Sequence, residues 1–146
     1  GVPIGACMAR RTAAEMMTPG SHGTTFGGNP LATRAALAVL DAMESGDLVA
    51  QAGRRGQQLL EGFREQLANQ PGVHSIRGRG MMIGIELDRP CRELVGMAIE
   101  RGLLINVTAD RVVRLLPPLI TTEHQAQMIV EKVSELIQEF LAEPDA

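Results

Sequence analysis

The later two thirds of the chain alternates between the periodicity of a strand and that of a helix, in an order that few folds accept. Residues 73–77 and 82–87 alternate or run apolar, as strands do, and residues 90–101 then carry apolar side chains at helical spacing. Two further strands are expected at residues 103–107 and 112–118, followed by a long amphipathic helix. The order β-β-α-β-β-α predicts an α/β chain with an α+β domain, in which helices cover one face of a small, mostly antiparallel sheet.

The last helix is the one best defined by its side chains. Thr122 and Gln125 match a capping box, in which each side chain bonds to the backbone N–H of the other residue. Lys132, the only lysine among 14 basic residues, is expected on the outer face of this helix. The apolar side chains that follow the box form a single stripe: Ile129, Val133, Leu136, Ile137 and Phe140.

Residues 1–46 are organised differently. The first residues alternate as the end of a short buried strand would, and residues 10–28 read as a loop rich in Gly, Thr and Ser. Asn29 as N-cap and Pro30 at the first helical position predict a helix whose sides are mostly apolar, which indicates burial between two layers.

A boundary between two domains is expected near Gly46. Asp47 should cap a second amphipathic helix, which extends to about Ala68 and lies on the core of residues 47–146. Residues 1–46 would then belong to a larger domain.

Composition excludes several classes of function. The net charge is -3 with scattered arginines, and there are 3 Phe and no Trp or Tyr, so we expect no nucleic-acid partner. Cys7 and Cys91 lie far apart, and the three histidines share no ligand spacing, so no metal site is expected. No apolar run is long enough to span a bilayer and no signal pattern is present, so we expect a cytoplasmic protein without a membrane partner.

The segment "GRGMMIG" at residues 78–84 contains the Gly-x-Gly of a dinucleotide-binding motif. A strand follows it where that motif requires a helix, so we interpret it as a bulge or a tight crossing between two strands.

Arg114 interrupts the apolar strand "VVRLLPPL", just before two prolines. Its side chain should face opposite to those of Val113 and Leu115. Either that face is open to solvent, or the guanidinium meets a carboxylate in a forked geometry. The prolines favour a strand that ends at the rim of a cleft.

Residues 21–32, "SHGTTFGGNPLA", place two hydroxyls among glycines directly before a helix. The free amides of the first helical turn, with Thr24 and Thr25 as additional donors, would suit an anion such as phosphate. The alternative is an ordinary turn with a helix cap.

Four motifs occur in the order and at the intervals of one enzyme family: "GVPIGA", "PGSHGTTFGGNPLA", "IRGRGMMIGIEL" and "VVRLLPPL". The match to this family covers essentially the whole chain. With these motifs the sequence resembles the C-terminal part of a class III pyridoxal-phosphate-dependent aminotransferase, most of all the acetylornithine and ornithine aminotransferases.

The resemblance implies a fold type I enzyme that works as a homodimer, with pyridoxal 5′-phosphate at the subunit interface. Residues 1–46 would be a remnant of the large cofactor-binding domain, and residues 47–146 would be the small C-terminal domain. Thr25 would bind the cofactor phosphate of the neighbouring subunit, and Thr24 would lie beside the substrate. Arg114 would bind a substrate carboxylate or pair with a glutamate.

The same resemblance implies that the Schiff-base lysine lies upstream of Gly1, so the chain alone should hold no catalytic residue and be inactive. The longer protein, here called the parent enzyme, is expected to transfer an amino group from N-acetylornithine to 2-oxoglutarate in arginine biosynthesis. An ornithine, succinylornithine or 4-aminobutyrate aminotransferase stays open, as does a stand-alone, non-catalytic interaction module.

Overall fold

The structure, a computed structural model, describes residues 1–142. The chain divides into two compact units, Gly1–Gly46 and Asp47–Ala146. Each unit is built from its own elements and is described separately.

The described part of the second unit holds four strands: β1 (Val73–Arg79), β2 (Met82–Leu87), β3 (Asn106–Thr108) and β4 (Val112–Leu115). They form one sheet in the order β1-β2-β4-β3, and every neighbouring pair is antiparallel. The last strand in the sequence, β4, therefore lies inside the sheet, between β2 and β3. The expected antiparallel sheet is confirmed.

Both strands of the second pair are shorter than the sequence predicts, since residues 103–105 and 116–118 form no strand. The pairing of Asn106 with Arg114 explains this difference. In that register, residues before Asn106 would have to pair with residues around Pro117, which has no backbone N–H to donate.

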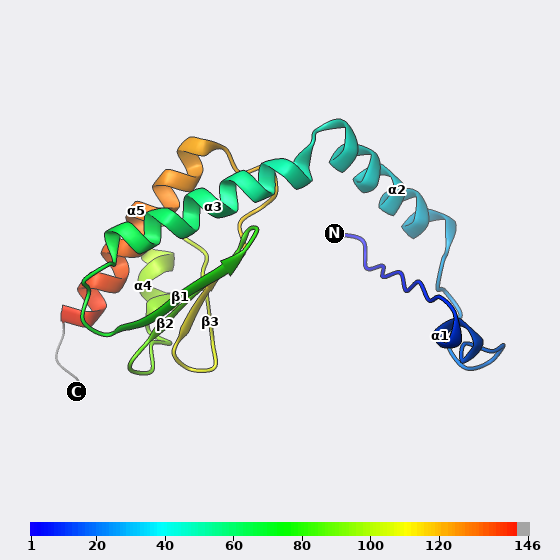
Figure 1. Cartoon of the computed structure of the whole chain (residues 1–146), viewed down its shortest axis with the longest axis horizontal. Helices are drawn as coiled ribbons and strands as arrows, with labels where there is room; N and C mark the ends of the chain where they lie inside the picture. The colour runs from blue at the N-terminus through cyan, green and yellow to red at the C-terminus, as the bar shows by residue number, and fades with distance from the viewer. Residues whose placement is uncertain (143–146) are drawn as a thin grey trace. The chain divides into compact units, whose positions relative to one another are not determined.

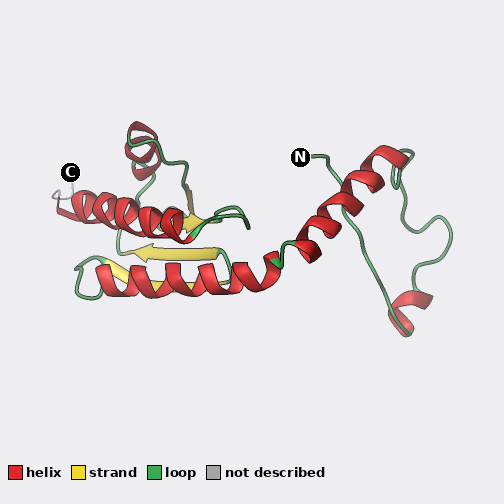
Figure 2. Ribbon diagram, turned by 90° about the horizontal axis from the view of Figure 1, so that it is seen from above, coloured by secondary structure: helices red, strands yellow, loops and turns green. Residues whose placement is uncertain are grey.

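Three helices cover one face of this sheet: α3 (Leu48–Gln66), α4 (Leu94–Glu100) and α5 (Glu123–Ala142). Figure 1 and Figure 2 show α3 and α5 running alongside each other on the same side of the strands. The core between helices and sheet is almost entirely aliphatic, and its largest fully buried side chains include Phe63, Leu59, Ile83, Ile85, Leu94, Val113, Leu136 and Ile137. Burial of each such side chain contributes about 1.5–3 kcal/mol.

The helix ends follow the sequence in two places and depart from it in two. The capping box is confirmed, because Thr122 N donates to Gln125 Oε1 at 2.9 Å and Gln125 N donates to Thr122 Oγ1 at 3.2 Å. The end of the preceding helix at Ser45 is also as expected.

Asp47 does not cap α3, contrary to expectation. Its backbone is left-handed, with φ of 48°, and its side chain makes no capping bond. Only Gly46 and Asp47 separate two helices, and this short connection turns the carboxylate towards Arg54, at 3.7 Å. The other departure is α4, which begins at Leu94 because the N–H of Cys91 is bonded to Asp110 O.

The Gly-x-Gly segment forms the tight crossing expected from sequence. Arg79 pairs with Met82, so Gly80 and Met81 form a two-residue hairpin turn, with Gly80 at φ of 55°. A side chain at Gly56 of α3 would place its Cβ 2.0 Å from Gly80 O, so the helix crosses directly over this turn. The only irregularity recorded in the pairing of β1 with β2 lies earlier, between Val73 and Ser75.

The first unit contains two helices in its residues 1–46: α1 (Thr12–Glu15) and α2 (Pro30–Ser45). The expected strand at Val2–Ala6 is absent, and these residues are exposed. A strand needs a hydrogen-bonded neighbour, and residues 1–46 contain no other strand to provide one.

Helix α2 is less buried than its sequence predicts. Ala32 is its only buried residue, while Leu31, Leu37, Val39 and Leu40 are exposed by half or more. Residues 1–46 by themselves therefore do not supply the two covering layers. No helix in the described residues is long and apolar enough to cross a membrane.

Candidate functional site

The glycine-rich loop before α2 is shaped by its own hydrogen bonds. Asn29 caps the helix, because its Oδ1 accepts the N–H of Ala32 at 3.0 Å, while its Nδ2 donates to Phe26 O at 2.9 Å. Gly27 N donates to Thr24 O at 3.2 Å, and a Cβ at Gly27 would lie 2.7 Å from Thr24 Oγ1. A larger residue at position 27 would therefore displace the Thr24 hydroxyl where the loop folds over it.

The predicted phosphate donors lie in this loop, and both are exposed. Neither the Thr24 hydroxyl nor the Thr25 hydroxyl has a hydrogen-bond partner within residues 1–142, so both can donate to a ligand. Thr24 lines a cavity of about 600 Å³, whereas Thr25 does not. The other lining residues are Pro3, Ile4, Gly5, His22, Gly23, Phe26, Gly27, Gly28, Asn29 and Ala32.

Arg114 lies on the face of the sheet that the helices leave uncovered. Its neighbours Val113 and Leu115 point into the core and are buried, whereas Arg114 is exposed. Within the part of the chain that the structure describes, its guanidinium has no ion-pair or hydrogen-bond partner. The sequence left two alternatives for this side chain: a solvent-exposed face, or a forked contact with a carboxylate. In the described residues Arg114 lies on an open face and its guanidinium is free.

The register of the strands places a row of four residues across this open face: Arg77, Gly84, Arg114 and Asn106. A cavity of about 410 Å³ lies over the row and is lined by three arginines. Its full lining is Arg77, Gly78, Arg79, Met82, Ile83, Gly84, Thr108, Val112 and Arg114.

Arg77 differs from Arg114 because it is already paired. Its NH1 group donates to Glu86 Oε2 at 2.6 Å and to Ser75 Oγ at 2.7 Å, and Ser75 Oγ donates to the same Glu86 oxygen at 3.1 Å. The hydrogen bond from Arg77 is the main cause that lowers the pKa of the Glu86 carboxyl.

Sequence reasoning missed this group. The period-two alternation of Ser75 and Arg77 on one strand with Glu86 on the next could have indicated it, but only after the two strands had been paired.

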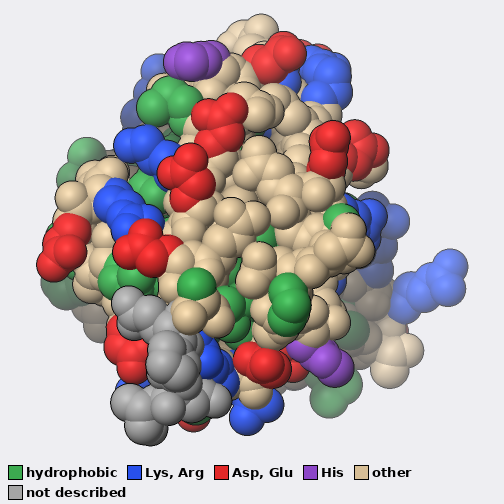
Figure 3. All heavy atoms as spheres, turned by 90° about the vertical axis from the view of Figure 1, so that its left-hand side faces the viewer, with side chains coloured by type: hydrophobic (Ala, Val, Ile, Leu, Met, Phe, Trp, Pro, Cys, Tyr) green, Lys and Arg blue, Asp and Glu red, His purple; other side chains and the backbone are tan. Residues whose placement is uncertain are grey.

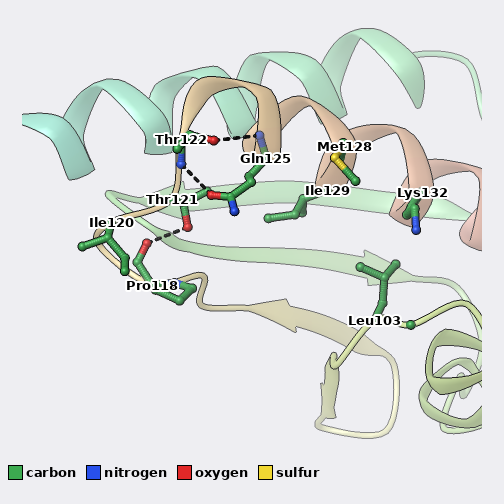
Figure 4. A pocket seen from close by; sticks show the side chains of 10 residues that line it. Leu103, Pro118, Ile120, Thr121, Thr122, Gln125, Met128, Ile129 and Lys132 are labelled. Carbon is green, nitrogen blue, oxygen red and sulfur yellow. Dashed lines mark hydrogen bonds between the residues drawn. The ribbon is translucent and has the colours of Figure 1, made fainter.

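Lys132 is not on an outer face, contrary to expectation. It is half-buried and lines a cavity of about 570 Å³, and Figure 4 shows it at the opposite end of this cavity from Ile120 and Thr121. Its Nζ donates to Arg101 O at 3.4 Å, at the C-terminal end of α4. A lysine at that place satisfies a free carbonyl and opposes the negative end of the helix dipole, which explains its position.

Cys91 is not a reactive thiol, and residues 1–142 contain no metal-binding cluster. Cys91 is fully buried, and burial raises the pKa of its thiol to about 11, so it stays protonated. No group of three or more His, Cys, Asp or Glu in residues 1–142 could hold a metal ion. Figure 3 shows acidic and basic side chains intermixed on the face that it draws.

Comparison with known proteins identifies the family. The family model described as "Aminotransferase class-III" matches residues 1–137. Acetylornithine aminotransferase 1 of Bordetella bronchiseptica is 55% identical over 98% of this chain and 36% of its own length. Acetylornithine aminotransferase of Nitrosomonas europaea is 52% identical over 97% of this chain and 36% of its own length.

Solved structures agree with this assignment. The ornithine aminotransferase of Toxoplasma gondii matches 94% of this chain and 34% of its own with a TM-score of 0.84, at 31% identity. Acetylornithine aminotransferase of Elizabethkingia anophelis matches 88% of this chain and 35% of its own with a TM-score of 0.77, at 32% identity.

The chain therefore spans about a third of the length of the relatives that it matches. Its fold is that of the corresponding third of a fold type I, pyridoxal-phosphate-dependent transferase, as the sequence predicts. The family model, the curated relatives and the solved structures agree over nearly all of its residues, and the chain belongs to the class III aminotransferases.

Proposed function

We propose that the chain is the C-terminal third of an N-acetylornithine:2-oxoglutarate aminotransferase, a homodimeric, cytoplasmic enzyme of arginine biosynthesis. The observation that carries this proposal is the identity of 52–55% with proteins named acetylornithine aminotransferase, over 97–98% of the chain. Identity among the solved structures does not separate the two substrates, at 31% for the Toxoplasma gondii ornithine aminotransferase and 32% for the Elizabethkingia anophelis acetylornithine aminotransferase.

The cofactor of the parent enzyme would be pyridoxal 5′-phosphate, whose ring supplies the electron sink for amino-group transfer when it is bound. The residues of the glycine-rich loop fit its phosphate. Thr25 keeps its hydroxyl free of partners within residues 1–142, and the first turn of α2 adds a positive dipole end. Thr25 would hold the phosphate and take no part in proton transfer, since its hydroxyl is already committed to the anion.

The substrates would be an amino acid and a 2-oxo acid, and both carry carboxylates. Arg114 is suited to bind such a carboxylate, because its guanidinium pairs with no carboxylate of the described chain, whereas Arg77 in the same row is paired with Glu86. Thr24, which lines the cavity beside the loop, would lie at the substrate.

The proposal is tested with the full-length protein that contains this chain. Glutamate formation from 2-oxoglutarate is measured with N-acetylornithine, ornithine, N-succinylornithine and 4-aminobutyrate as donors. The highest kcat/KM is expected for N-acetylornithine. A higher kcat/KM for another donor would identify that donor as the substrate. If no donor supports transfer, the result would instead favour a non-catalytic module.

A further inference from the structure

Gly84 occupies the position between the two arginines of the open-face row. It pairs with Arg77 on β1 and with Arg114 on β4, so both neighbours in the row are long cationic side chains. Neighbouring positions in such a row lie about 4.5–5.5 Å apart, close enough for their side chains to touch. Glycine is the one residue that leaves the space between them empty.

Neither the backbone nor the packing requires a glycine at this position. Its φ lies outside the left-handed region. A Cβ there would lie 3.5 Å from Val112 Cγ1 and 3.9 Å from Arg77 Cγ, both of which are ordinary contacts. Glycine inside a strand is also less stable than alanine by about 0.5–1 kcal/mol. The fold therefore gives no reason for the missing side chain.

The cavity over the row explains why this position lacks a side chain. Gly84 and Arg114 both line the 410 Å³ cavity. Arg77 does not fill the space, since its guanidinium is bound to Glu86 and Ser75 in the adjacent row. At Gly84, therefore, no side chain occupies the part of the cavity beside the free guanidinium of Arg114.

We infer that Gly84 is a specificity-determining position, which keeps open the space where a substrate carboxylate meets Arg114. This inference rests on the proposed function, in which Arg114 binds the carboxylate. A side chain at this position would fill the space in proportion to its volume, and it would weaken carboxylate binding while leaving the bond-making groups of the enzyme in place.

The test uses full-length enzyme with a size series at one position, Gly84→Ala and Gly84→Val. The probe is glutarate, a dicarboxylate that cannot accept an amino group, and the measurement is its inhibition constant against 2-oxoglutarate. Losing one hydrogen bond to a charged group corresponds to about 10- to 150-fold in affinity, so Gly84→Val should raise the inhibition constant by about tenfold or more. The constant of Gly84→Ala should lie between those of the unaltered enzyme and Gly84→Val.

Asn106→Val is the matched control, because Asn106 lies in the same row on the other side of Arg114 and does not line the cavity. Its inhibition constant should match that of the unaltered enzyme. An unchanged constant in Gly84→Val, or an equal rise in Asn106→Val, overturns the inference while the unaltered enzyme remains active. If the unaltered enzyme transfers no amino group, the proposed function has failed instead.

Discussion

The contact between Gly56 of α3 and the hairpin turn at Gly80 predicts an unusual effect of a conservative mutation. An alanine Cβ at position 56 would lie 2.0 Å from the carbonyl oxygen of Gly80 and 2.3 Å from its carbonyl carbon. Carbon atoms in contact prefer a separation of about 3.5–4.0 Å, so helix and turn must separate by more than about 1 Å. Both partners are backbone, and neither can rotate away.

The expected cost follows from two opposing effects. Overpacking a core costs about 1–3 kcal/mol, and this contact belongs near the upper end because only backbone can move. Replacing glycine with alanine in a helix returns about 1 kcal/mol. Gly56→Ala should therefore destabilise the second unit by about 2 kcal/mol, which lowers the Tm by about 8–16 °C for a domain of this size.

Gly53 provides the control in the same helix. It is exposed, and a Cβ there would meet nothing within 4 Å. Gly53→Ala should raise the Tm, because it gains helix propensity without a clash. Thermal unfolding of both variants by circular dichroism measures the difference. A Gly56→Ala variant that melts at or above the temperature of the unaltered chain would refute the reasoning.

Four further predictions concern the cofactor loop, the accessibility of the thiols, the pH dependence of stability and the order of proteolysis. In the full-length enzyme, Thr25→Val should raise the dissociation constant of pyridoxal 5′-phosphate by about 10- to 150-fold, while Thr24→Val should mainly raise the KM of the amino donor; equal cofactor affinity in both variants would contradict the assigned roles. In the folded chain, Cys7 should react with iodoacetamide and buried Cys91 should not. Because the pKa of Cys91 is raised from 9.0 to about 11, only the unfolded chain loses this proton between those values, so chemical denaturation should show stability falling as the pH rises through that window. Limited proteolysis of the chain should cut before Pro30 first, because the residues there are exposed; early cuts within the sheet would argue against this order.

The elements of the second unit could be predicted where local chemistry determines them. The capping box at Thr122 and Gln125 is contained in four consecutive residues, and the alternation along β2 places Ile83, Ile85 and Leu87 on one face. Arg114 could be singled out because a cation in an apolar strand must face away from the core. These features are determined by residues that lie close together in the sequence, so they could be predicted from it.

Other features depend on residues distant in sequence. The strand pairing ends at Asn106, which lies opposite Arg114, and that register is visible only in the assembled sheet. The cap expected at Asp47 is absent because two helices meet there without a loop. The position of Lys132 depends on a carbonyl of α4, 31 residues earlier in the chain.

The interior position of β4 determines how Arg114 can respond to its ligands. Strand β4 is paired with β2 on one side and with β3 on the other, which holds the backbone around Arg114, whereas its side chain is bound to nothing in the described chain. On the proposed function, one site must accept a donor and an acceptor of different lengths in alternation. The adjustment would come from rotation about the side-chain bonds of a single arginine, within picoseconds to nanoseconds for an exposed residue. Exchange of one substrate for the other would then require no movement of the sheet.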